Sequence, residues 1–160
     1  MTRSVEKLQA SHVLDPFDCG TEALNRYLKR HALINQLTGV STTYVGLADQ
    51  IVIGYYSLAA ASVNHDEAPE RIKKGLPGYP IPVALLARLA VDLKWQHKGV
   101  GPALLKDAML RILQAAEEIG IRAILVHAKD EKARDFYAKF DFIQSPTERL
   151  HLFIALNDII

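Results

Sequence analysis

The sequence contains almost none of the residues that build metal centres or disulfide frameworks. Cys19 is the only cysteine among 160 residues, which excludes an intrachain disulfide and a zinc site made of thiolates. The six histidines lie along the chain without the short spacing typical of metal ligands, so we expect no bound metal. No apolar run approaches the about 20 residues of a membrane-spanning helix, which favours a soluble, cytoplasmic protein.

An excess of charge of one sign is lacking too, because 19 Lys and Arg residues face 18 Asp and Glu residues, for a net charge of +1. This balance excludes a chain coated with basic residues for nucleic-acid binding, but it leaves a local basic patch open. The apolar share of 49% is typical of a globular protein, and the length fits one domain spanning residues 1–160.

Hydrophobic periodicity predicts an α/β (α+β) protein with a mixed sheet. Helices are expected over about 21–37, 99–120 and 131–140, with a short one within 65–74. Strands are expected in a hairpin over 41–63, and over 83–91, 121–127, 142–143 and 150–156. In the long helix, we expect apolar residues from Leu105 to Ile119 to form the buried face and Gly120 to end the helix.

A glycine-containing loop joins the 83–91 strand to this long helix. It consists of Gln96-His97-Lys98-Gly99-Val100-Gly101-Pro102. Glycines allow positive φ and close approach of the backbone to an anion, a helix start offers free N–H groups, and proline suits the first helical turn. The pattern indicates a phosphate or pyrophosphate site, with a plain tight connection as the alternative. It is neither a Rossmann fingerprint nor a P-loop, because it lacks the third glycine and the Gly-Lys-Ser/Thr sequence.

The loop, following Leu89-Ala90-Val91, resembles motif A of the GNAT superfamily of acetyl-CoA-dependent N-acetyltransferases. The segment from Asp130 to Phe142, which contains the pair Phe136-Tyr137, is similar to the second signature of that superfamily. The resemblance implies the GNAT fold, a mixed central sheet with helices on both faces, and acetyl-CoA as cosubstrate. It assigns acetyl-CoA binding to Leu89, Ala90, Val91, Gln96, His97, Lys98, Gly99, Val100, Gly101, Pro102, Asp130 and Phe136.

The chain departs from the superfamily pattern at two positions. Asp141 stands where glycine is usual, which predicts a different turn into the next strand. Asp130 stands where asparagine is frequent, which bears on a side-chain contact to the pantetheine arm of the cosubstrate.

Further segments are similar to the toxin branch of the superfamily. They are Phe17–Gly20, Leu24–Leu28, Gly54–Leu58, Tyr79–Val83 and Leu86–Asp92. That branch acetylates the amino group of charged tRNA and is neutralised by a ribbon-helix-helix antitoxin. The resemblance therefore implies an aminoacyl-tRNA substrate, an antitoxin partner of that fold and a homodimer.

Acetyl transfer requires a polarised thioester carbonyl and a protonated leaving thiolate. The resemblance assigns the first task to backbone N–H groups of Leu89–Val91, and the second to Tyr137 as catalytic acid. A phenol with a pKa of about 10 keeps its proton at neutral pH. A core aromatic residue beside Phe136 is the alternative for Tyr137. No side chain stands out as general base, which fits an α-amino acceptor with a pKa of about 8.

Positive charge is concentrated in residues 71–106, where seven basic residues accompany one acidic residue, Asp92. The seven are Arg71, Lys73, Lys74, Arg88, Lys94, Lys98 and Lys106. His97 and Lys98 are expected to face the phosphates of acetyl-CoA. Lys73, Lys74 and Lys94, together with Lys29 and Arg30 of the first helix, are candidates to contact a tRNA backbone, with ordinary solvated charge as the alternative.

Two other functions stay open on the sequence. One is a GNAT enzyme that acetylates a protein or a small-molecule amine, and the other is a non-enzymatic CoA-binding interaction module.

Cys19 lacks an evident histidine partner and is expected to be a small buried thiol. Arg88 interrupts an apolar strand, so it is expected to be either paired or at a functional edge.

Overall fold

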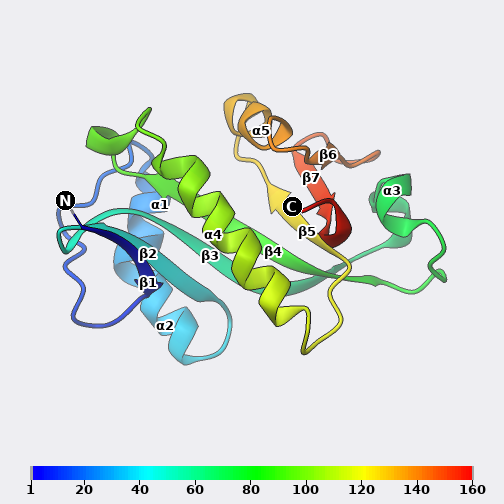
Figure 1. Ribbon diagram of the computed structural model, residues 1–160, viewed down its shortest axis with the longest axis horizontal. Helices are drawn as coiled ribbons and strands as arrows, with labels where there is room; N and C mark the ends of the chain where they lie inside the picture. The colour runs from blue at the N-terminus through cyan, green and yellow to red at the C-terminus, as the bar shows by residue number, and fades with distance from the viewer. Residues whose placement is uncertain (1, 160) are drawn as a thin grey trace. The chain divides into compact units, whose positions relative to one another are not determined.

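The computed structural model describes residues 2–159 and divides them into two compact units (Figure 1). The first unit contains the described residues up to Ala59 together with Ala87–Ala108, and the second contains Ala60–Leu86 and the described residues from Met109 onward. The strand order is β1-β2-β3-β4-β5-β7-β6. Strands β3 (Ile51–Val63) and β4 (Ile81–Val91) contribute residues to both units.

In the first unit, antiparallel strands carry helices on both faces (Figure 1). β2 (Thr42–Ala48) pairs with β1 (Arg3–Lys7) and with β3, and the register places Val45 opposite Tyr55 and Gly46 opposite Gly54. Side chains alternate between the faces of a strand, so these two pairs face opposite ways.

One face of this unit is covered by a nearly continuous helical segment, α1 (Glu22–Arg26), η1 (Tyr27–His31) and α2 (Ala32–Leu37). Tyr27 and Leu28 of this segment share a buried cluster with Val45 and Tyr55. On the other face, a Cβ placed on Gly54 would lie 2.7 Å from a methyl carbon of Leu104, so helix α4 (Val100–Ala115) packs directly on the glycine pair. The expected helices on both faces are thereby confirmed.

In the second unit, a parallel strand pair adjoins an antiparallel one. β4 runs parallel to β5 (Ala123–His127), with Val83 opposite Ala123, and β5 is antiparallel to β7 (His151–Ala155). The short β6 (Ile143–Gln144) completes the edge beside β7. Ile72 of α3 (Glu70–Lys73) packs in a buried cluster with Val83, Leu125 and Phe153.

The structure confirms most of the predicted elements and corrects several boundaries. The expected helix over 21–37 contains a π-helical turn, η1, and strand β1 was missed. α4 ends at Ala115, five residues before Gly120, because the N–H groups of Glu117 and Glu118 bond three residues back in tight turns, to Gln114 and Ala115. Ile119, expected in the buried face, is 61% exposed.

Within residues 2–159, no helix is both long and apolar enough to cross a bilayer. In the same residues, no group of three or more His, Cys, Asp or Glu side chains is arranged to hold a metal ion.

Candidate active site

The glycine loop of the first unit is fastened at its start by two side chains. Asp92, directly after β4, accepts hydrogen bonds from the backbone N–H groups of Lys94 (2.9 Å) and Asp18 (3.1 Å). Gln96 Nε2 donates to the carbonyl oxygens of Val91 (3.0 Å) and Cys19 (3.1 Å). The amide nitrogen of Gln96 therefore serves the loop itself. A contact from this residue to acetyl-CoA would come from its other polar atoms.

The backbone of the loop opens toward solvent. His97 has φ 62° and Gly99 has φ 83°, and nothing lies within 4 Å of a Cβ placed on Gly99. The first helical hydrogen bond of α4 joins the N–H of Ala103 to the carbonyl of Gly99 (3.2 Å). The N–H groups of Val100 and Gly101 precede that bond, so they are available to a ligand, as at any helix start.

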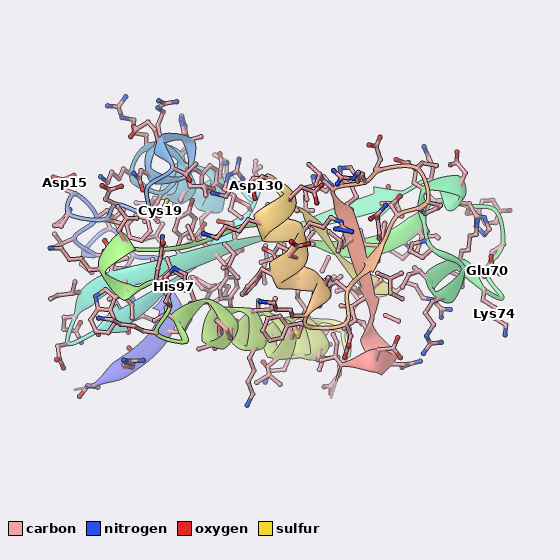
Figure 2. All side chains as sticks on the ribbon, turned by 90° about the horizontal axis from the view of Figure 1, so that it is seen from above. Asp15, Cys19, Glu70, Lys74, His97 and Asp130 are labelled. Atoms are coloured by element: carbon pink, nitrogen blue, oxygen red, sulfur yellow. The ribbon has the colours of Figure 1, made fainter. Side chains whose placement is uncertain are left out.

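This geometry fits the pyrophosphate of a coenzyme A ester. Positive φ at alternate residues turns successive N–H groups toward one concave surface, which favours anions. Pro102 has no N–H to leave unsatisfied, and its side chain is exposed. His97 and Lys98 are exposed beside the loop, with Lys98 Nζ 5.5 Å from the ring centroid of Trp95 (His97 is labelled in Figure 2).

The end of β4 carries the backbone groups expected to polarise a carbonyl. The parallel pairing with β5 covers Val83–Leu86, so Leu89 and Val91 lie beyond it. The N–H of Asp92 donates to Ile53 of β3 (2.9 Å), and alternation along the strand directs the N–H of Ala90 toward β3 as well. Leu89 and Val91 therefore present their N–H groups on the opposite side. Of the three expected donors, the geometry favours these two over Ala90.

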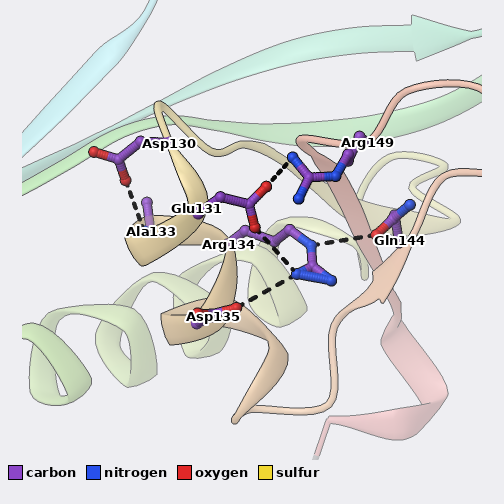
Figure 3. Close-up of polar contacts among 7 residues, drawn as sticks. All are labelled: Asp130, Glu131, Ala133, Arg134, Asp135, Gln144 and Arg149. Atoms are coloured by element: carbon purple, nitrogen blue, oxygen red, sulfur yellow. Dashed lines mark hydrogen bonds and ion pairs between the residues drawn. The ribbon is translucent and has the colours of Figure 1, made fainter.

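In the second unit, Asp130 is the N-cap of α5 (Glu131–Ala138). Its Oδ1 accepts a hydrogen bond from the N–H of Ala133 (2.9 Å), so one carboxylate oxygen is committed to the helix. Figure 3 shows the exposed ion pairs that follow, in which Arg134 contacts Glu131 (3.5 Å) and Arg149 contacts the same carboxylate. Exposed pairs of this kind contribute little to stability. Asp130 itself is exposed.

Tyr137 is the buried residue of α5, with 7% of its surface exposed. Its ring contacts Phe136 (5.1 Å between centroids) and Phe142 (5.4 Å). Burial raises the pKa of Tyr137, so its phenol keeps its proton at neutral pH. Within the described residues, its hydroxyl makes no hydrogen bond, so the proton is available to another group. The ring of Tyr137 packs as the alternative of a core aromatic residue predicts, but its hydroxyl makes no hydrogen bond within the described residues.

Phe136 and Asp141 complete the second signature. Phe136 packs on Phe140 at 5.2 Å between ring centroids and on Tyr137, so it contributes to an aromatic cluster. Asp141 has φ 72°, the left-handed conformation that glycine adopts easily. Asp141 adopts this conformation at the expense of some backbone strain, so its φ does not support the prediction of a different turn.

Comparison with known proteins fits this geometry. A family model described as the acetyltransferase (GNAT) domain matches residues 40–144. The chain belongs to the GNAT acetyltransferase family. It is an acetyl-CoA-dependent N-acetyltransferase, and its mixed sheet with helices is the GNAT fold.

Among relatives of this acetyltransferase is a protein of Mycobacterium tuberculosis (strain ATCC 25618 / H37Rv) named tRNA-acetylating toxin. It is 49% identical over 142 residues, which cover 89% of this chain and 85% of the relative. A solved structure of AtaT complexed with acetyl-methionyl-tRNAfMet has a TM-score of 0.91 at 30% identity, with 99% of this chain and 97% of that chain covered. A tyrosine-to-phenylalanine mutant of the AtaT toxin, bound to the C-terminus of the antitoxin AtaR and to acetyl-CoA, has a TM-score of 0.84 at 29% identity, with 98% and 95% covered.

The structure distributes the expected site residues of the acetyltransferase over its two units. The first unit contains the end of β4 and the whole glycine loop, and the second contains Asp130, Phe136 and Tyr137. The candidate tRNA contacts divide similarly, with Lys29, Arg30 and Lys94 in the first unit and Lys73 and Lys74 in the second (Lys74 is labelled in Figure 2). Four of these five cations are exposed, and Lys73 is half-buried.

The structure of the acetyltransferase also shows the surroundings of Cys19 and Arg88. Cys19 is buried, and its Sγ lies 3.5 Å from the carbonyl oxygen of Thr21, as expected for a small buried thiol (Figure 2). Arg88 Cζ lies 3.6 Å from the ring centroid of Tyr27. In the sequence, Arg88 stood out as the single arginine in an apolar strand. Its aromatic partner Tyr27 lies 61 residues away along the chain and is visible only in the tertiary structure.

Proposed function

We propose that this acetyltransferase transfers the acetyl group of acetyl-CoA to the α-amino group of an aminoacyl-tRNA, and that it acts as a toxin by blocking translation. The observation that carries the proposal is the 49% identity, over 89% of the chain, to the tRNA-acetylating toxin. An acetylated α-amine cannot attack a carbonyl in peptide-bond formation, which explains how such an activity would be toxic.

The glycine loop is the proposed holder of the cosubstrate. The N–H groups of Gly99, Val100 and Gly101 would bind the pyrophosphate, with Lys98 adding positive charge and His97 a polar ring at the rim. When bound, acetyl-CoA supplies the acetyl thioester. Leu89 and Val91 would donate hydrogen bonds to the carbonyl oxygen, where negative charge develops during attack by the amine.

Tyr137 is the proposed catalytic acid. Its raised pKa holds the proton on Oη throughout the neutral range, and the hydroxyl has no competing acceptor in the described part of the chain. The phenol would donate its proton to the sulfur as the C–S bond breaks, and the proton that the attacking amine loses would restore the phenol, so that amide and thiol form with no net change at Tyr137. The acceptor needs little help from a base, because an α-amine with a pKa of about 8 is partly neutral at cellular pH.

The remaining features of the toxin are proposals of the same kind. Lys29, Arg30, Lys73, Lys74 and Lys94 would contact the tRNA backbone. The antitoxin partner would be a ribbon-helix-helix protein, and the toxin would form a homodimer in the cytoplasm, each chain forming a single GNAT domain over residues 1–160. The complexes of AtaT with the C-terminus of an antitoxin and with an acetylated tRNA support an antitoxin partner and a tRNA substrate.

The test is incubation with labelled acetyl-CoA and either charged or deacylated total tRNA. We expect label on the charged tRNA alone, because only the aminoacyl group offers an amine of suitable pKa. Reversing the charge at Lys73 and Lys74 should weaken this reaction while leaving acetyl-CoA affinity as it is. Label that enters protein or small amines but not charged tRNA would contradict the proposal, and so would binding of acetyl-CoA without transfer to any acceptor.

A further inference from the structure

Arg88 is a half-buried cation without an acidic partner. In the described residues, no carboxylate lies within ion-pair distance of its guanidinium, which instead lies over the ring of Tyr27 with Cζ 3.6 Å from the centroid. A guanidinium stacked on an aromatic face keeps its N–H donors in the plane, directed away from the ring. The donors of Arg88 are therefore directed toward an in-plane acceptor that residues 2–159 do not provide.

The platform under Arg88 is rigid. The hydroxyl of Tyr27 is 2.8 Å from Ser41 Oγ and accepts a hydrogen bond from Asn35 Nδ2 at 3.2 Å. The ring of Tyr27 also stacks on that of Tyr55, at 6.5 Å between centroids and 15° between planes. Tyr27 begins the π-helical turn η1, and turns of this kind occur frequently at functional sites. These contacts hold the ring of Tyr27 in place beneath the guanidinium.

The position of Arg88 relates it to the transfer chemistry. It immediately precedes Leu89, whose N–H is proposed to bind the thioester oxygen, and both belong to the first unit. The side chain of Arg88 lies on the face covered by η1, opposite to the face on which α4 packs. Lys29 and Arg30 are exposed on the same turn as Tyr27.

We propose that Arg88 binds the phosphate that precedes the terminal nucleoside of the aminoacyl-tRNA and thereby positions the α-amine for attack. This inference rests on the proposed function. In an aminoacyl-tRNA the carboxyl group of the amino acid is esterified, so the terminal phosphate is the anion nearest to the reacting amine. A planar guanidinium matches a phosphate with two parallel hydrogen bonds, which fixes geometry as well as affinity.

The experiment uses two minimal acceptors, an aminoacyl-adenosine with and without a 5′-phosphate, and the full-length enzyme. We expect the phosphate to raise kcat/KM of the wild type by about 10- to 100-fold, the range for hydrogen bonds to a charged group. In Arg88→Gln the values for the two acceptors should converge. Arg88→Lys should retain part of the difference, because it keeps the charge but loses the planar fork.

Controls separate this role from a structural one. Arg26→Gln removes an exposed cation from the helix turn before Tyr27 and should keep the wild-type ratio between the two acceptors. Calorimetric titration with acetyl-CoA reports whether each variant is folded and binds its cosubstrate.

Four outcomes would overturn the inference. An equal loss on both acceptors in Arg88→Gln would indicate a structural role, and a loss of acetyl-CoA affinity with the phosphate preference intact would assign Arg88 to the cosubstrate. If the wild type acetylates aminoacyl-tRNA while Arg88→Gln keeps the full phosphate preference, this inference alone fails. If the wild type acetylates no aminoacyl-tRNA, the proposed function fails and this inference with it.

Discussion

Replacing Tyr137 by phenylalanine removes one oxygen atom from a buried ring and tests the proposed acid. The packing against Phe136 and Phe142 is kept, and the lost hydroxyl makes no hydrogen bond within the described residues. We therefore expect the free energy of unfolding to change by less than about 1 kcal/mol. Turnover should fall about 10²- to 10⁴-fold, the usual range for a general acid, which corresponds to about 3–5 kcal/mol of transition-state stabilisation.

The assay compares turnover, measured by release of free thiol, with stability and with acetyl-CoA affinity in the same preparation. Tyr79→Phe is the matched control, because Tyr79 is 76% exposed and should lose neither turnover nor stability. Since burial raises the pKa of Tyr137, its ionisation should not reduce wild-type turnover between pH 7 and about 9. Turnover of Tyr137→Phe within about twofold of wild type would refute the reasoning.

Gly54→Ala should lower the free energy of unfolding in urea by about 1–3 kcal/mol, because the new Cβ would lie 2.7 Å from Leu104 and 3.0 Å from the carbonyl oxygen of Ala90. Gly78→Ala, which has open space, should stay near wild type. Gly99→Ala should weaken acetyl-CoA binding in calorimetry by roughly 5- to 30-fold, because φ 83° strains any residue with a Cβ by about 1–2 kcal/mol. Burial, followed by the charge of His151, lowers the pKa of His127. As pH falls, this histidine therefore binds a proton in the unfolded chain at a higher pH than in the folded chain. The free energy of unfolding in urea should fall as pH drops from 7 toward 5, and it should fall less in His127→Gln.

Each of these three predictions has a result that contradicts it. Wild-type stability of Gly54→Ala would mean that α4 does not pack on this glycine as the structure has it. An acetyl-CoA affinity of Gly99→Ala equal to that of the wild type would show that the loop conformation at Gly99 does not contribute to cosubstrate binding. A pH profile of stability that His127→Gln leaves as it is would show that this histidine has the same pKa in the folded and unfolded chain.

The parts of the fold that sequence patterns predicted are those set by local rules. Gly99, Gly101 and Pro102 mark the start of α4 because the conformations that they require or permit are properties of the residues themselves. The hairpin over 41–63 and the strand preceding the loop follow from runs of β-branched and aromatic residues. The end of α4 escaped prediction, because Gly120 lacks the positive φ of a helix cap and the apolar spacing continues past Ala115 into an exposed turn.

The missed features depend on contacts between distant segments. Strand β1 is short and mostly polar, and it is defined by pairing with β2, from Arg3 opposite Ala48 to Lys7 opposite Tyr44. Neither the π turn at Tyr27 nor the stacking of Arg88 on its ring has a sequence signature. Gln96 was assigned correctly to the loop, but the use of its amide nitrogen to hold Cys19 and Val91 required the tertiary structure.

The measurement that tests the account most directly is mass spectrometry of the amino acid released by mild alkali from charged tRNA after incubation with this protein and acetyl-CoA. We predict an increase by the mass of one acetyl group, located on the α-nitrogen and lost in Tyr137→Phe over the same incubation. Recovery of the unmodified amino acid from the wild-type reaction, with acetyl-CoA either intact or spent on another amine, would contradict it.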